Sequence, residues 1–260
     1  MQSANSAADT GDPVSNAVVN PEASLFIREI LEKALTNPVG VAPRWLADAW
    51  ALLANVLMND YLNWWNDAGP EELKMADNAV QNALTLNSEL AFAHHVKGLI
   101  YRARGQSKEA LRAFRKAKHL DSGFARAHAQ FGNQKASLAR ENEVQDPLTK
   151  AMQLSPRHPA SGYFYWGKGR AFFQQGDWPV AIEWLTKSVD ALPTVWYNRC
   201  YLACARHNNG DIDAARQIMA DFINDPRFAQ ATFTRIKQLR PDPNDPARKR
   251  VLDFVQPLLP

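Results

Sequence analysis

A repeat with a period of about 34 residues constrains this fold more than any other sequence feature. KGRAFFQQG (168–176) has a counterpart in KGLIYRARG (97–105), with Lys, Gly, an aromatic residue and a closing Gly at the same offsets. Gly132 lies one such period after Gly98, and Gly210 lies one period after Gly176. A period of this length is typical of stacked units, because one such unit cannot bury its apolar face alone.

Each unit is predicted to contain two helices separated by a tight turn. Small and bulky residues recur at spacings of four and three after each closing glycine, which is the pattern of one helix face. They are Ala110, Phe114 and Ala117, then Ala181, Leu185 and Ser188, then Ala215, Met219 and Phe222. Stop signals follow at Asp121-Ser122, Ser155-Pro156, Leu192-Pro193 and Asp225-Pro226. Gly105, Gly176 and Gly210 are expected to take positive φ where the first helix ends.

The pattern resembles the tetratricopeptide repeat. In the unit that begins at Ala91, the signature slots hold His94, Lys97-Gly98, Tyr101, Ala110, Phe114, Ala117 and Ser122. The resemblance implies an all-α, right-handed α-solenoid of stacked antiparallel helix pairs, with about five units plus capping helices. The expected units are 43–90, 91–124, 125–158, 159–193 and 194–229, with C-terminal capping helices over 228–258. Together with a helix at 21–35, they make a repeat domain over 21–260, and residues 1–20 are expected to form a disordered leader or linker.

The first unit is longer than the others because of the segment Tyr61 to Gly69. Pro70 and the acidic pair that follows it predict the start of its second helix. Trp64 and Trp65 lie in the insertion, and two interpretations remain open. They either pack against the neighbouring helices or anchor a protein partner, since tryptophan is enriched at binding hot spots.

Residues 43–260 are also similar in style to the repeat tails that follow class III nucleotide cyclase domains in proteobacteria. The chain has no room for a cyclase catalytic domain, so the resemblance does not imply that activity. It supports an alternative hypothesis, in which the chain is the regulatory module of a multidomain signalling protein.

Composition argues against several classes of function. The 30 basic and 27 acidic side chains leave a net charge of +3, which predicts no nucleic-acid partner. No apolar run is long enough for a membrane span, and no targeting segment is present at the start. Two cysteines and no signal peptide favour a cytoplasmic location.

No constellation of residues points to catalysis or to a cofactor. Gly167 to Arg170 resembles a phosphate-binding loop, but it falls inside a predicted helix whose amides are already bonded. Cys200, Cys204 and His207 share a helix face and raise the hypothesis of a metal or small-molecule sensor, although no fourth ligand is visible. We therefore predict a non-enzymatic protein without a metal site.

The resemblance to tetratricopeptide repeats implies a binding site in the concave groove formed by the first helices. An extended peptide or protein segment with an acidic or C-terminal carboxylate and an apolar side chain would suit its cations and aromatic rings. The family's Lys- and Asn-based peptide clamp is not reproduced in this chain. The groove residues are Asn55, Asn59, His95, Arg102, Arg126, Gln130, Asn133, Tyr163, Trp166, Arg170, Tyr201 and His207.

Overall fold

The computed structural model describes residues 21–38, 40–137, 145–155, 161–229, 231–238 and 245–259. The predicted leader at 1–20 lies outside the described residues. Among those that are described, the regular structure is helical, with no strand. The all-α prediction is therefore confirmed for this part of the chain.

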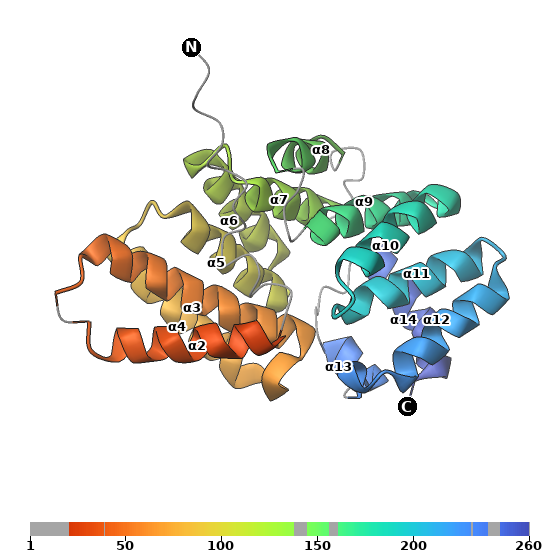
Figure 1. The fold of residues 1–260 in the computed structure, drawn as a ribbon. Coiled ribbons are helices and arrows are strands. Elements are labelled where there is room, and N and C mark those ends of the chain that lie inside the picture. Colours follow the sequence, from red (N-terminus) through yellow and green to blue (C-terminus); the bar gives the residue numbers. More distant parts are fainter. Residues whose placement is uncertain are drawn as a thin grey trace, which may run out of the picture.

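The helices pack as consecutive pairs. The first helices of the pairs are α3 (Pro43–Asn63), α5 (Ala91–Ala103), α7 (Ala125–Ser137), α9 (Ser161–Gln175) and α11 (Trp196–Asn208). Their partners are α4 (Pro70–Leu86), α6 (Ser107–Leu120), α8 (Gln145–Leu154), α10 (Trp178–Ala191) and α12 (Ile212–Asn224). Each first helix packs on its own partner, and successive pairs pack on one another. The array forms an arch, with α7 to α9 at its top (Figure 1).

Further helices complete the two ends of the array. α2 (Pro21–Thr36) packs against α3 at the N-terminal end. At the other end are the short helices η3 (Pro226–Phe228), α13 (Phe233–Gln238) and η4 (Gln256–Leu258), together with α14 (Pro246–Val255). Of these, α14 packs on α11 and α9.

The closing glycines behave as the repeat predicts. Gly105, Gly176 and Gly210 have φ values of 73°, 78° and 92°. This left-handed conformation suits glycine because it has no Cβ to clash with the following carbonyl oxygen. Each of them therefore ends its first helix and lets the second helix fold back.

The glycines inside the first helices permit close packing within a pair. A Cβ atom at Gly98 would lie 2.6 Å from Cδ1 of Phe114, and one at Gly169 would lie 2.7 Å from Cγ of Leu185. Phe114 and Leu185 occupy the same slot of their units and are fully buried. The side chain nearest to Gly98 is therefore that of Phe114, and the side chain nearest to Gly169 is that of Leu185.

A repeated hydrogen bond ties the start of a first helix to the loop before it. The Nε2 atoms of His94 and His128 each donate to a backbone carbonyl six residues earlier, at 2.9 and 3.0 Å. Arg199 makes the same connection to the carbonyl oxygen of Pro193 at 2.6 Å. These side chains therefore satisfy backbone carbonyl groups of the loops between units.

The insertion in the first unit closes the arch. The chain turns sharply after α3, through Trp64, the short helix η1 (Trp65–Asp67) and Ala68, and α4 then begins at Pro70 as predicted. Trp64 and Trp65 are 8% and 6% exposed. The Trp64 ring stacks on the Trp196 ring of α11, with 4.5 Å between centroids and 10° between planes. The insertion therefore contacts the fifth pair of helices, and neither open interpretation of the two tryptophans had included this contact.

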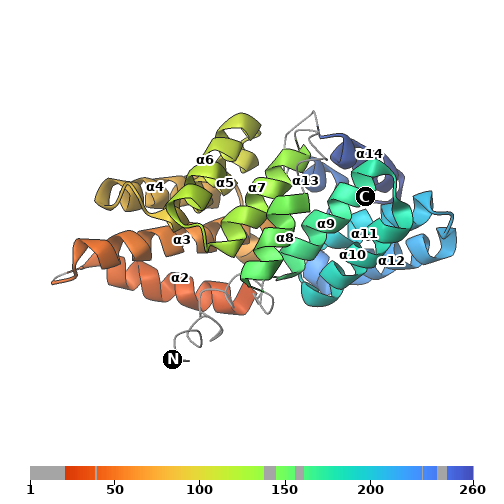
Figure 2. The ribbon, with the colours of Figure 1, turned by 90° about the horizontal axis from the view of Figure 1, so that it is seen from above.

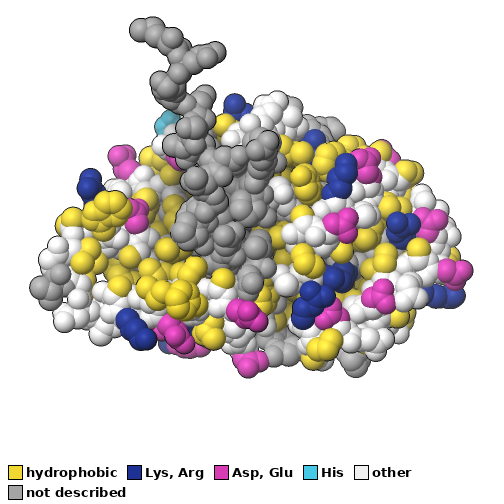
Figure 3. Space-filling view, in the orientation of Figure 1, with side chains coloured by type: hydrophobic (Ala, Val, Ile, Leu, Met, Phe, Trp, Pro, Cys, Tyr) yellow, Lys and Arg dark blue, Asp and Glu magenta, His cyan; other side chains and the backbone are white. Residues whose placement is uncertain are grey.

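The face of the molecule that is drawn in Figure 3 carries mixed charge. Lys and Arg side chains alternate with Asp and Glu side chains over the described part of the face in Figure 3. Apolar side chains are exposed on α2, where Phe26 is 64% and Ile30 is 49% exposed. None of the described helices is both long enough and apolar enough to cross a membrane.

Candidate functional site

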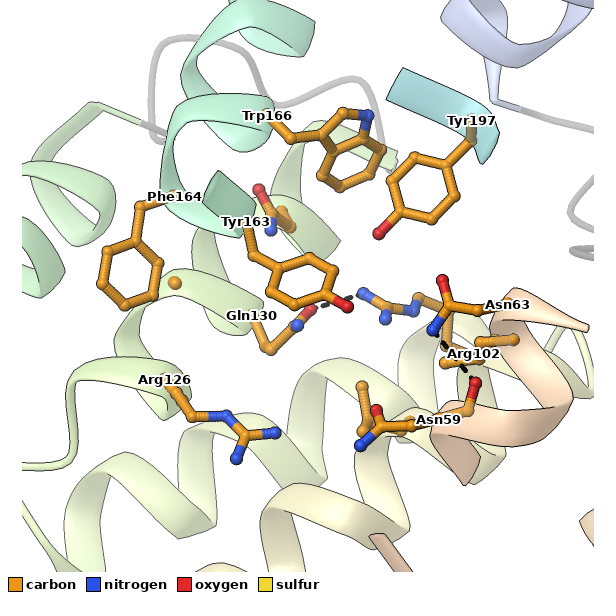
Figure 4. A pocket seen from close by; sticks show the side chains of 13 residues that line it. Asn59, Asn63, Arg102, Arg126, Gln130, Tyr163, Phe164, Trp166 and Tyr197 are labelled. Carbon is orange, nitrogen blue, oxygen red and sulfur yellow. Dashed lines mark hydrogen bonds between the residues drawn. The ribbon is translucent and has the colours of Figure 1, made fainter. Parts of the chain in front are cut away.

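A pocket lies on the inner side of the arch, and all five first helices contribute to it. Its volume is about 560 Å³, including the part that is open to solvent. Figure 4 shows how the polar and aromatic side chains converge on this space. The lining residues are Asn59, Leu62, Asn63, Leu99, Arg102, Arg126, Ala129, Gln130, Asn133, Tyr163, Phe164, Trp166 and Tyr197. We call this space the central pocket.

Seven of the predicted groove residues line the central pocket. They are Asn59, Arg102, Arg126, Gln130, Asn133, Tyr163 and Trp166. They come from α3, α5, α7 and α9, because the repeat places corresponding positions of each first helix on the same side of the array. In the sequence, the predicted groove residues of each unit lie about one or two helical turns apart, and this spacing indicates that they share a helix face.

The arginines of the pocket are held by neutral amide side chains. Arg102 donates to the Oε1 atom of Gln130 at 2.6 Å, and Arg126 donates to the Oδ1 atom of Asn55 at 3.1 Å. Asn55 is itself fully buried, so it positions Arg126 from behind the pocket wall. The described lining residues include these two cations and neither Asp nor Glu.

Asparagines of α3 add hydrogen-bonding capacity to the pocket wall. Asn59 and Asn63 are each 5% exposed, and the Nδ2 atom of Asn63 donates to the carbonyl oxygen of Asn59 at 3.0 Å. The Nδ2 atom of Asn59 is buried without a hydrogen-bond partner among the described residues. A buried donor of this kind favours a ligand that brings an acceptor.

His95 lies in a separate aromatic environment. It is fully buried, and its ring lies 6.1, 6.0 and 5.2 Å from the rings of Phe92, Phe114 and Phe124. Burial lowers the pKa of His95 well below its usual value, and the nearby arginines of the pocket lower it further. The imidazole is therefore neutral at physiological pH, and it is not part of the pocket lining.

Arg170 is engaged within the chain. Its guanidinium group is 2% exposed and forms an ion pair with Asp245, the residue that precedes α14. It also donates to the carbonyl oxygen of Asn133 at 3.0 Å, and it lies 5.4 Å from the Trp166 ring centroid. The third predicted groove cation therefore has a carboxylate ligand supplied by the same chain.

The last two predicted groove residues lie near the C-terminal helix. Tyr201 is 5% exposed and lines a second hollow beneath α14. His207 is exposed, with its ring 5.1 Å from the ring of Phe254. The structure therefore brings seven of the twelve predicted groove residues into one pocket, while Asn55, His95, Arg170, Tyr201 and His207 lie outside its lining.

The sequence reasoning also missed several lining residues. Leu62, Asn63, Leu99, Ala129, Phe164 and Tyr197 line the pocket without having been among the predicted site residues. A signal was available for Asn63, since it follows Asn55 and Asn59 at the same four-residue spacing. A signal was also available for Tyr197, since it lies on α11, which packs on α9, and its ring meets that of Trp166.

The geometry of the cysteines does not support a metal site. Cys200 and Cys204 are buried free thiols, and burial raises the pKa of each to about 12. The described residues contain no group of three or more His, Cys, Asp or Glu side chains placed to hold a metal ion.

Comparisons with solved structures identify the fold. PilF of Pseudomonas aeruginosa superposes with a TM-score of 0.55 at 18% identity, over 83% of this chain and 93% of that one. PilW, a widely conserved type IV pilus biogenesis factor, gives 0.58 at 18% identity, over 81% and 92% of the two chains. TTC0263, a tetratricopeptide-repeat protein of Thermus thermophilus, gives 0.52 at 18% identity, over 74% and 96%.

No family model matches this chain, and no curated protein matches it in sequence. Because the sequences of these three structures differ so widely from this one, the structural likeness concerns the fold alone. The chain therefore has the fold of tetratricopeptide-repeat proteins, as the period of its repeat implied.

Proposed function

We propose that this chain is a non-enzymatic scaffold that binds a peptide or protein partner on the inner face of the arch. Tetratricopeptide-repeat folds present extended concave surfaces, and recognition depends on the side chains that line them. The observation that carries the proposal is the central pocket, in which two arginines and the Asn59 amide stand beside aromatic rings. The alternative of a regulatory module of a multidomain signalling protein rests on sequence resemblance alone.

The chemistry of the pocket favours a carboxylate. Guanidinium groups bind carboxylates through paired, charge-assisted hydrogen bonds, which are the stronger hydrogen bonds in proteins. Arg102 and Arg126 now donate to neutral amide oxygens, and an incoming carboxylate would be a stronger acceptor than either. The Asn59 Nδ2 atom supplies one more donor.

The aromatic wall favours an apolar side chain close to that carboxylate. Trp166 is 2% exposed, and its ring meets that of Tyr197 edge to face with 5.1 Å between centroids. Such a rigid wall costs little conformational entropy on binding. An acidic side chain or a C-terminal carboxylate next to an apolar residue therefore fits the pocket.

The proposal is tested by selecting peptides from a random library with free C-termini on the purified chain. The affinity of the selected peptides is then compared between wild type, the variant Arg102→Gln with Arg126→Gln, and a control. The control replaces Arg112 and Lys116 by Gln, which makes the same change of charge at exposed positions of α6.

We expect selected peptides to carry a carboxylate beside an apolar residue, and the pocket variant to bind them at least about tenfold more weakly. The control should bind them like wild type. Peptides that bind all three proteins equally would show that the central pocket is not the binding site.

A further inference from the structure

The C-terminal helix occupies the inner side of the array. α14 packs on α11 and α9, the first helices of the last two pairs. Figure 2 shows α14 on one side of these helices, with α10 and α12 on the other. A helix that simply extended the array would stack on α11 and α12 at its end. α14 instead covers part of the concave surface, which is where such arrays bind partners.

The contact that begins α14 is an ion pair in a buried setting. Asp245 is 7% exposed, and its carboxylate pairs with Arg170. The same carboxylate accepts a hydrogen bond from the backbone amide of Arg248 at 3.2 Å, so it also caps the helix. Any segment that replaced α14 would need a carboxylate here, because an unpaired buried guanidinium is strongly destabilising.

The remainder of α14 contributes small apolar side chains along one face. Ala247, Val251 and Val255 recur every four residues and are each at most 5% exposed. They belong to the same apolar cluster as Tyr197 and Tyr201. Together with Asp245, they define a recognition pattern: an acid at the helix cap, followed by apolar residues two, six and ten positions later.

α14 does not fill the surface that it covers. A hollow of about 380 Å³, including the part open to solvent, remains between α14, α13 and α11. Aromatic and thiol side chains of α11 form one wall of it, and Asp245, Arg248, Val251 and Leu252 form another. A helix with bulkier apolar residues in these positions would bury more surface than α14 does.

We infer that the concave face of α9 and α11 is a second binding surface, which takes a helical segment from a protein partner in place of α14. The segment has an Asp or Glu at its N-cap, and its apolar residues follow at the spacing seen in α14. α14 is then an internal pseudo-ligand that the partner displaces. This inference does not depend on the proposal that the central pocket binds a carboxylate.

The test uses the full chain and a synthetic, fluorescent peptide that spans residues 244–259. Its affinity is measured by fluorescence anisotropy for wild type, for Asp245→Asn and for the control Asp253→Asn. Asparagine at 245 keeps the shape and a capping oxygen but removes the charge, and Asp253 is an exposed residue of the same helix.

We expect the peptide to bind Asp245→Asn at least tenfold more tightly than wild type, because the weakened internal helix competes less well. Asp253→Asn should match wild type. A peptide that itself carries Asn at 245 should bind Asp245→Asn at least tenfold more weakly than the native peptide does. Equal affinity of the peptide for wild type and Asp245→Asn, or equal binding of the two peptides, would overturn the inference.

If Asp245→Asn does not fold, a second measurement tests whether α14 leaves the concave face. In wild type, native-state hydrogen exchange should show the amides of α14 exchanging at least tenfold faster than those of α11, through an opening that leaves the array intact. Val251→Ala, which leaves the ion pair in place, should increase this difference. Exchange of α14 and α11 at one common rate in both proteins would show that the helix does not leave the surface.

Discussion

Gly98 offers a direct test of how the helices of one unit pack. In Gly98→Ala, the new methyl group would lie 2.6 Å from Cδ1 and 2.9 Å from Cζ of Phe114, roughly 1 Å closer than ordinary contact. The Phe114 ring is fully buried, and it lies against His95 and below the Arg102 guanidinium. The ring therefore has little room to move aside.

Two opposing effects set the size of the change. Overpacking a buried site lowers the free energy of unfolding by about 1–3 kcal/mol. Because the methyl group would lie roughly 1 Å too close to the Phe114 ring, we expect a cost in the upper part of that range. Replacing glycine by alanine inside a helix returns about 1 kcal/mol. We expect a net loss of about 1–2 kcal/mol, which lowers the Tm of a domain of this size by about 2–8 °C.

The assay is thermal and urea unfolding followed by far-UV circular dichroism, in a double-mutant cycle with Phe114→Ala. Without the ring, the methyl group at 98 has space, so the same substitution should become neutral or stabilising. If Gly98→Ala stabilises the wild-type chain, or destabilises both backgrounds equally, the close approach of Gly98 and Phe114 does not explain the glycine.

Three further predictions concern pH, the closure of the arch and the thiols. Burial raises the pKa of Asp60 to about 6 although Ser24 donates to it at 2.6 Å, so the folded state holds this proton more tightly than the unfolded state. The free energy of unfolding of the wild type therefore falls as pH rises from about 4 to 6. Asp60→Asn should be more stable than wild type at pH 8 by on the order of 1–2 kcal/mol, but not at pH 4, as measured by urea unfolding. Trp64→Ala removes the ring stacked on Trp196 and should cost about 3 kcal/mol or more in the same assay, whereas Trp64→Phe should retain part of that stability. Cys200 and Cys204, with pKa values of about 12, should react with a thiol reagent only after denaturation, and rapid labelling of the native chain would contradict their burial.

The conformation of the insertion shows how closure of the arch is maintained. Trp64, Asn66 and Asp67 have φ values of 60°, 52° and 56°, which cost about 1–2 kcal/mol per non-glycine residue. Trp196 offsets this cost by stacking on Trp64 and by donating from Nε1 to the carbonyl oxygen of Leu62 at 3.2 Å. The strained turn is therefore held by contacts with a helix at the other end of the array.

Much of the fold followed from the sequence because the residues that define a repeat lie close together in the chain. The period placed the first helices and their partners, and the three closing glycines have the positive φ expected of them. The same repeat put Arg102, Arg126 and Trp166 on one side of the array, since equivalent slots of neighbouring units face the same way. These features depend on contacts within a unit or between adjacent units, which the spacing of residues records.

Only the tertiary structure decided the contacts between distant units. The stacking of Trp64 on Trp196 depends on the curvature of the whole array, and the pairing of Arg170 with Asp245, 75 residues later, depends on the path of the C-terminal segment. Curvature is the sum of small rotations between many units, and no single repeat encodes it. The sequence alone thus determined which side chains share the inner face of the array, whereas the structure showed that its own C-terminal helix occupies part of that face.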